Sequence, residues 1–327
     1  MFAAANRMKP TLKVSCTAVT LALTLAAADQ RVNLLPKLQP GQVLTYLIRF
    51  RTDKKVKTES KVVVPFAPNG VQIDAHGLLR IEILEIQETT GKPMIHGRAR
   101  FLTLDSGVRL KHPDDQKPNW DIERMDPAGK TIEFTISSAG SFDQVSGLDS
   151  FSLDEQQAWQ EWAARFAAAW SLPVLEAKVG EQWKSEQPEP GASPLAALFW
   201  ARDSSYVRNE PCRASQRSLS GEFSFSSGPD DSCAVLLTSA KLTQKSSAKD
   251  ATPEDFKLHE LKTMGTAKGT NETITYISLA TGLVVRATEE ASQQMDVVVA
   301  KADGSNRVHY NVDATSHSEV LLITETR

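Results

Sequence analysis

The sequence predicts an α+β fold made mainly of antiparallel strands, with two curved sheets in tandem and one principal amphipathic helix over residues 152–170. Alternating apolar and polar residues recur along most of the chain, which is typical of strands buried on one face. Short turns that contain glycine separate many of these runs. One stretch, Ser152–Trp170, instead repeats its apolar residues at helical spacing.

Residues 1–28 have the features of an export signal. Arg7, Lys9 and Lys13 form a basic start, and the apolar run Val14–Ala28 follows and ends in small residues. The run is shorter than the ~20 residues that span a bilayer, which favours a cleaved signal over a membrane anchor. We therefore expect a periplasmic or extracellular protein with no transmembrane span in its mature chain.

Residues 29–151 are expected to form an N-terminal β-rich half. A turn at Asp53–Lys55 is expected to end the first strand and to begin a second, which gives an exposed hairpin. A polar segment with two prolines, Lys111–Asp126, is interpreted as a surface loop. The expected strands are Gln42–Phe50, Val56–Val64, Gly77–Gln87, Met94–Leu104, Gly129–Ser137 and Phe142–Ser146.

The helix is expected to connect the two halves within residues 152–172. Ser152 can accept a backbone hydrogen bond at the helix start, and Pro173 ends the segment because proline lacks an amide hydrogen. Its large aromatic residues fall on one face and either cover a sheet or line an apolar cavity. On the second interpretation they are the candidate ligand-binding residues: Trp159, Trp162, Phe166 and Trp170.

Residues 173–327 are expected to form a C-terminal β-rich half that ends in a meander. Gly265–Thr270 is interpreted as a turn between strands, because the spacing and the GK[ST] of a phosphate loop are missing. Phe256–Met264 fits either a helix or a strand, with the strand favoured. The expected strands are Phe199–Val207, Cys233–Leu242, Glu272–Leu279, Leu283–Glu290, Met295–Ala300, Val308–Val312 and Glu319–Thr324.

Removal of the signal leaves two cysteines, Cys212 and Cys233. A pair of cysteines in an exported chain predicts a disulfide, which here closes a loop rich in serine and glycine. A metal site is the weaker interpretation, because two cysteines without a nearby histidine supply too few ligands for zinc.

Composition and motifs argue against several classes of function. The net charge of -3 and the lack of a long basic run argue against nucleic acid as a partner. None of the six histidines stands in a metal-binding motif, and no serine stands in a GxSxG motif, so we expect no metal, no cofactor and no enzyme activity. The alternative is a hydrolase with an unrecognised site among His76, His96, His309 and His317.

Four segments together resemble a family of uncharacterised exported bacterial proteins rich in β-strands. They are PKLQPGQVLTY, TIEFTISSAGSFDQVSG, LPVLEAKVGEQWKSE and LATGLVVRA. The resemblance implies a location in the cell envelope and a β-rich fold, and it carries no established activity. A more distant architectural likeness is to periplasmic lipoprotein carriers, in which helices close a curved sheet around an apolar cavity.

The leading hypothesis is a non-catalytic envelope protein that binds an apolar small molecule or another envelope protein through a groove between sheet and helix. The hydrolase is the alternative, and a purely structural interaction module is the third hypothesis. The oligomeric state and a duplication of the two halves are left open.

Overall fold

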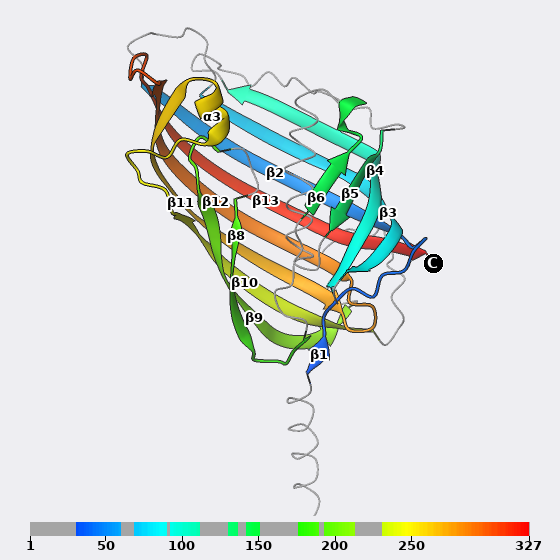
Figure 1. Cartoon of the computed structure of the whole chain (residues 1–327). Coiled ribbons are helices and arrows are strands. Elements are labelled where there is room, and N and C mark those ends of the chain that lie inside the picture. The colour runs from blue at the N-terminus through cyan, green and yellow to red at the C-terminus, as the bar shows by residue number, and fades with distance from the viewer. Residues whose placement is uncertain are drawn as a thin grey trace, which may run out of the picture.

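The structure is a computed structural model, and it describes residues 31–59, 69–89, 92–111, 130–136, 142–150, 176–189, 193–212 and 231–326. Eleven strands form one antiparallel sheet, and two short strands form a second (Figure 1). The strands are β1 (Val32–Asn33), β2 (Val43–Glu59), β3 (Gly70–Thr89), β4 (Lys92–Lys111), β5 (Ile132–Ile136), β6 (Phe142–Ser146), β7 (Glu176–Ala177), β8 (Gln182–Pro188), β9 (Leu198–Pro211), β10 (Ser232–Gln244), β11 (Leu261–Ser278), β12 (Val284–Lys301) and β13 (Val308–Thr326).

The prediction of two sheets in tandem is wrong, because strands from both halves of the chain belong to the same sheet. The strand order is β6-β5-β4-β3-β2-β13-β12-β11-β10-β9-β8. The first long strand, β2, pairs with the last strand, β13, in a register that runs from Val43↔Thr326 to Glu59↔His309. We call this pairing the β2–β13 seam, and it joins the two halves edge to edge.

The α+β class is also wrong, because the described residues are almost entirely β-structure. Within the described ranges the helical elements are a 3-10 turn, η1 (Leu148–Ser150), and a short α-helix, α3 (Glu254–Leu258). No principal amphipathic helix occurs among them. The segment predicted as that helix, residues 152–170, lies outside the described residues, as does the predicted export signal over residues 1–28.

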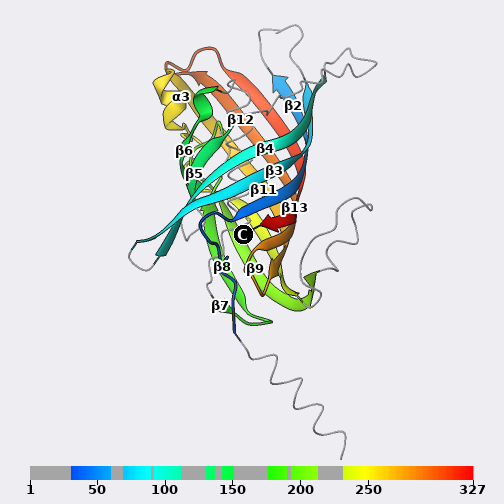
Figure 2. The ribbon, with the colours of Figure 1, turned by 90° about the vertical axis from the view of Figure 1, so that its right-hand side faces the viewer.

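The large sheet is strongly curled. Figures 1 and 2 show its two end regions, β5–β6 and β8–β9, on the same side of the central strands β2, β13 and β12. The face turned toward this inside is the inner face. Because side chains alternate along a strand, the two faces have different compositions. The largest core cluster lies on the inner face and includes Tyr46, Leu79, Phe134, Tyr206, Leu236 and Leu322.

A second apolar cluster lies at the other end of the inner face. It contains Trp200, Leu242 and Val297, with exposed fractions of 8%, 7% and 1%. Gly269 of β11 leaves room for the indole of Trp200, since a Cβ there would lie 3.1 Å from the ring. The inner face is therefore apolar and closely packed toward both of its ends.

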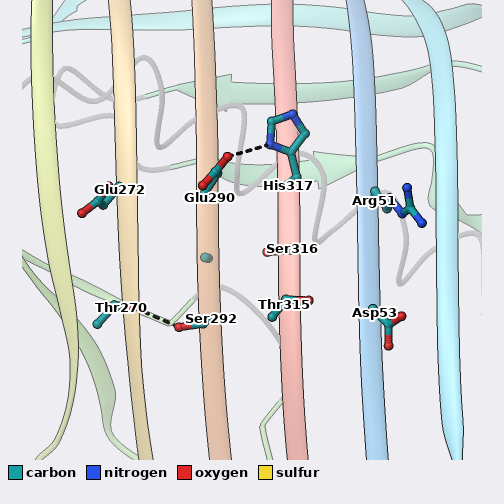
Figure 3. A pocket seen from close by; sticks show the side chains of 10 residues that line it. Arg51, Asp53, Thr270, Glu272, Glu290, Ser292, Thr315, Ser316 and His317 are labelled. Carbon is teal, nitrogen blue, oxygen red and sulfur yellow. Dashed lines mark hydrogen bonds and ion pairs between the residues drawn. The ribbon is translucent and has the colours of Figure 1, made fainter.

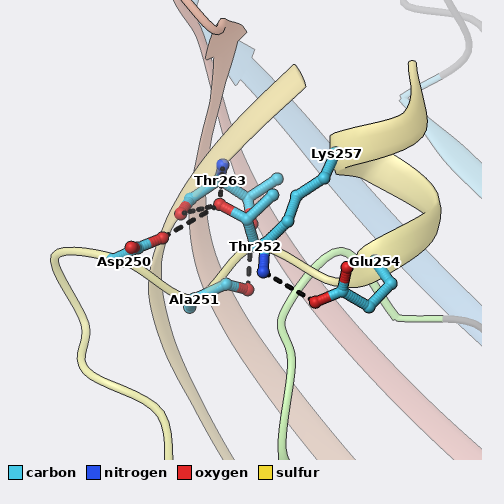
Figure 4. A network of polar contacts seen from close by, with 6 residues as sticks. All are labelled: Asp250, Ala251, Thr252, Glu254, Lys257 and Thr263. Carbon is cyan, nitrogen blue, oxygen red and sulfur yellow. Dashed lines mark hydrogen bonds and ion pairs between the residues drawn. The ribbon is translucent and has the colours of Figure 1, made fainter. Parts of the chain in front are cut away.

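The segment before β11, residues 245–260, is held to the start of β11 by hydrogen bonds of the buried residues Thr252 and Thr263 (Figure 4). The amide of Thr263 donates to the hydroxyl of Thr252 at 3.0 Å, and the hydroxyl of Thr263 donates to the carbonyl of Ala251 at 3.0 Å. On α3, Lys257 pairs with Glu254 at 2.7 Å. Hydrogen bonds made inside the protein keep these buried hydroxyls satisfied.

Two predicted turns are instead strand interior. β2 continues through Asp53–Lys55, because its neighbours β3 and β13 pair with it on both sides there. Gly265–Thr270 lies within β11, paired with β12 throughout. The strand favoured for Phe256–Met264 is only partly correct. Helix α3 covers Glu254–Leu258, and the strand β11 begins at Leu261. By contrast, β9 and β10 contain the strands expected for them, and β11 and β12 contain those expected as Glu272–Leu279 and Leu283–Glu290 to within one residue.

The predicted disulfide is confirmed. Cys212 and Cys233 are bonded with their Cα atoms 4.9 Å apart, and both residues are fully buried. They join the end of β9 to the start of β10, and they pack with Val285 and Tyr276. The bond thus ties together two strands that are already neighbours in the sheet.

The segment that precedes β2 packs on the β11–β12 turn. The amide of Lys37 donates to the carbonyl of Thr281 at 2.8 Å, and its ammonium donates to the carbonyl of Ala280 at 2.8 Å. Gly282 has a φ of 70°, and a Cβ there would lie 1.9 Å from the carbonyl oxygen of Leu35. This close approach requires glycine.

We expect Gly282→Ala to lower the free energy of unfolding by clearly more than Gly304→Ala. Both glycines have positive φ, so the backbone strain of an alanine, about 1–2 kcal/mol, is common to both variants. A Cβ on Gly304 meets nothing closer than an Arg307 nitrogen at 3.8 Å, so only Gly282→Ala adds a clash with backbone. Urea denaturation measures the difference, and equal losses would contradict the clash at Leu35.

Candidate functional site

The outer face of the sheet has an apolar cluster around Leu47 and Leu321, and its polar middle carries a shallow hollow of about 430 Å³ (Figure 3). The hollow crosses β2, β13, β12 and β11. A smaller hollow of about 310 Å³ adjoins it around Arg49, Asp74 and His76. Residues that line the first hollow are Arg51, Asp53, Thr270, Glu272, Glu290, Ala291, Ser292, Thr315, Ser316 and His317.

Many polar groups on the outer face pair with each other across strands. Arg286 contacts Glu319 at 2.8 Å, and both side chains are largely buried, with exposed fractions of 16% and 12%. His317 contacts Glu290 at 3.8 Å, and the hydroxyls of Thr270 and Ser292 are 2.9 Å apart. Such cross-strand pairs contribute roughly 0.2–1 kcal/mol each. These polar groups are therefore explained as contacts that stabilise the sheet.

The structure brings together two of the four histidines proposed for a hydrolase. His76 and His317 both line the smaller hollow, and Arg51 also lines it. His309 lies further along β13, between Asp296 and Glu59, and His96 lies 3.7 Å from Glu133. The four histidines thus belong to three separate places on the sheet.

The middle of the inner face differs from its two apolar ends. Two neighbouring cross-strand rows there are built of polar and small side chains, and we call them the inner belt. In register from β8 to β2, the first row is Ser185, Arg202, Ala240, Asn271, Ala291, Ser316 and Thr52, and the second is Trp183, Ser204, Thr238, Thr273, Glu289, Ser318 and Phe50. Aromatic residues thus close the second row at both ends. Most of these residues keep partial exposure, so solvent reaches the belt although it does not reach the clusters beside it.

Some polar groups of the inner belt satisfy one another. The hydroxyls of Ser204 and Thr238 are 2.8 Å apart, and the hydroxyl of Thr273 donates to the side-chain oxygen of Asn271 at 2.9 Å. Ser204 and Asn271 are 7% exposed. These pairs hold β9, β10 and β11 in place and need no ligand.

Four polar atoms at the inner belt are buried without a hydrogen-bond partner. Two lie in the first row, Nε of Arg202 and Oγ1 of Thr52, and one lies in the second, Nε1 of Trp183. The fourth is Nε2 of Gln293, the next inward-facing residue after Ala291 on β12. An unsatisfied buried polar group costs about 1–3 kcal/mol, so its presence calls for a functional explanation. The inner belt is therefore the candidate binding site.

The sequence contained a signal for Arg202 that the sequence-based reasoning missed. In β9, the side chain of Arg202 lies on the same face of the strand as those of Trp200, Ser204 and Tyr206, and this is the inner face. A cation in the apolar phase of a strand marks a place where the core is interrupted. The predicted ligand-binding residues Trp159, Trp162, Phe166 and Trp170 lie outside the described residues.

The described residues contain neither a metal cluster nor a membrane-spanning helix. Within the part of the chain that the structure describes, no three histidine, cysteine or acidic side chains are grouped so that they could hold a metal ion. No helix among the same residues is long and apolar enough to cross a bilayer.

Comparisons with known proteins give no family. No protein-family model matches the chain, and no curated protein matches its sequence. Among solved structures, Pseudomonas aeruginosa OccK11 (OpdR) is 8% identical with a TM-score of 0.17, over 88% of this chain and 99% of that one. OccK7 (OpdD) of the same organism is 8% identical with a TM-score of 0.19, over 87% of this chain and 100% of that one. These TM-scores are too low to support a conclusion, so the resemblances stated from the sequence stay predictions.

We expect the stability contributed by His309 to depend on pH. Its hydrogen bonds with Asp296, at 2.7 Å, and with Glu59, at 3.3 Å, raise the pKa of His309 above its usual value. The charged imidazole therefore stabilises the fold fully below the pKa of an unfolded histidine, ~6.5, and this contribution is lost as the pH rises through the higher folded-state pKa.

The measurement is urea denaturation of the wild type and of His309→Gln at about pH 5 and about pH 9, on either side of the ordinary histidine pKa. The wild type should exceed the variant by up to ~1 kcal/mol at the lower pH, because the site is partly exposed, and by less at the higher pH. Asp296→Asn should remove most of the same pH dependence while it keeps the histidine. A difference between wild type and His309→Gln that is independent of pH would contradict this assignment.

Proposed function

We propose that this chain is an exported, non-catalytic binding protein that holds a small amphipathic molecule against the inner belt. The observation that carries the proposal is the set of four buried, unpartnered polar atoms, on Arg202, Trp183, Thr52 and Gln293. They belong to four different strands and share the inner face. A molecule with polar groups in this space would satisfy atoms that the protein leaves unsatisfied.

The composition of the inner belt fits such a ligand. Ala240, Ala291 and Ser316, in the middle of the first row, have small side chains, which a bound molecule could approach closely. Apolar clusters flank the belt on both sides, with Tyr206 and Leu236 toward one end and Trp200 toward the other. Binding sites for small molecules commonly combine apolar walls with a few polar groups that fix orientation.

Export to the cell envelope is the second part of the proposal. The basic start and apolar run of residues 1–28 support it, and so does the Cys212–Cys233 disulfide. Disulfides persist in oxidising compartments and are rare in the cytosol, where thiols are kept reduced.

We expect the exported, unreduced protein to have no titratable thiol after its signal is removed. Both remaining cysteines are bonded to each other and fully buried. A thiol count with a chromogenic disulfide reagent in denaturant tests this, with a reduced sample as the control that should give two thiols. Free thiols in the unreduced sample would contradict an oxidising location.

The hydrolase hypothesis draws less support from the structure. Its best feature is the meeting of His76 and His317 at the smaller outer hollow. There Arg49 faces His76 across the strands and Arg51 faces His317. Two arginines beside two histidines favour binding of charge over nucleophilic attack, which needs a base next to a nucleophile.

We expect Ala291→Trp to abolish retention of the ligand and Ser292→Trp to leave it unchanged. The two residues are neighbours on β12 and both border the outer hollow, but side chains alternate along a strand, so that of Ala291 faces the inner belt and that of Ser292 the outer face. A tryptophan at 291 would fill the space beside Ser316, whereas one at 292 would extend into solvent. Native mass spectrometry of protein purified from the envelope fraction measures the bound mass.

The control for folding is circular dichroism of both variants, which should match the wild type. A wild type that carries no added mass would contradict binding at the inner belt. Equal retention of the mass by both variants would contradict it as well. Loss of the mass in Ser292→Trp alone would move the site to the outer hollow.

A further inference from the structure

We propose that the molecule held at the inner belt carries an anionic group, a carboxylate or a phosphate, and that Arg202 binds it. This inference rests on the proposed function and names the chemistry of its ligand. It begins from one buried cation. The Nε atom of Arg202 is shielded from water and has no hydrogen-bond partner.

Burial of the Nε donor of a guanidinium without a hydrogen-bond partner is unfavourable. Arginine remains charged in proteins, and a charge removed from water must be compensated by an opposite charge or by hydrogen bonds. Desolvation lowers the pKa of Arg202, which is the direction expected for a cation deprived of water. The neighbouring polar pairs do not relieve it, because Ser204 bonds with Thr238 and Asn271 with Thr273.

Glu289 is the acidic residue of the inner belt, and it partly offsets the burial of Arg202. Its charge favours the charged form of the guanidinium, although the effect of desolvation is the larger of the two. Glu289 has a further interaction of its own. A ligand anion at Arg202 would complete the compensation that Glu289 begins.

The geometry of the guanidinium specifies the kind of anion. Its planar set of donors matches the two oxygens of a carboxylate or a phosphate, and such bidentate contacts are stronger than neutral hydrogen bonds. Ala240, which has a small side chain, stands beside Arg202 in the same row. Nε2 of Gln293 is another unpartnered donor on the same face, on β12.

The test compares three probes that share one chain and differ in head group: dodecanoate, dodecyl phosphate and dodecanol, each below the concentration at which it aggregates. Calorimetric titration is carried out on the full mature protein and on Arg202→Gln, Arg202→Lys and Arg51→Gln. Arg51 is an exposed arginine of the outer hollow, so its variant is the matched control.

We expect the wild type and Arg51→Gln to bind an acidic probe about tenfold or more tightly than dodecanol. Arg202→Gln should lower the affinity for the acidic probe to that for dodecanol and leave dodecanol unchanged. Arg202→Lys keeps the charge without the planar fork and should fall between the two. The tighter of the two acidic probes identifies the anion.

Three results would overturn the inference. If the wild type binds the acids and the alcohol with equal affinity, the ligand needs no anionic group. That result would refute this inference but would not affect the proposed function. A preference for acids that survives Arg202→Gln but is lost in Arg51→Gln would place the anion on the outer face. A wild type that binds none of the probes would overturn the proposed function together with this inference.

Discussion

The β2–β13 seam is the constraint on which the rest of the structure depends. Without it, the chain would form one sheet that ends at β2 and another that ends at β13, each with an unpaired edge of more than fifteen residues. Long unpaired edges expose backbone donors and acceptors and favour aggregation. The seam removes both edges at once and leaves the shorter strands β6 and β8 at the ends of the sheet. Because one continuous sheet results, residues from β2 and β9 can face the same interior, and the inner belt exists.

The two faces of this sheet solve different physical problems. On the outer face, charges such as Arg286 and Glu319 pair across strands, so the face holds many charges at little cost. On the inner face, closely packed apolar clusters occupy both ends, and polar groups occupy the middle. A core interrupted in this way gives up burial energy in its middle. That loss is difficult to explain by stability alone, which is why the inner belt, and not the outer hollow, carries the functional proposal.

The sequence contained the local features of this structure but not its long-range order. The alternating run at β10, the β11–β12 hairpin and the Cys212–Cys233 pair were predicted because each depends on neighbouring residues or on simple chemistry. The continuation of β2 through Asp53–Lys55 was missed, since it depends on partners in β3 and β13 that lie on both sides of it. The single sheet was missed for the same reason. Arg202 could have been found from its phase with Trp200, but its missing hydrogen-bond partner depends on side chains from other strands, and no local pattern encodes that.

The seam also sets the order of events in folding. β2 is complete at Glu59, but its partner β13 begins only at Val308. At the usual pace of protein synthesis the ribosome needs on the order of ten seconds or more to add the intervening chain. During that interval one side of β2 has no partner, and loop closure over so long a segment is slow. Such a chain cannot complete its sheet while it is being made. The sheet closes only after the last strand has arrived, and this delay would suit the export proposed above, because a chain that crosses a membrane unfolded must not close its sheet first.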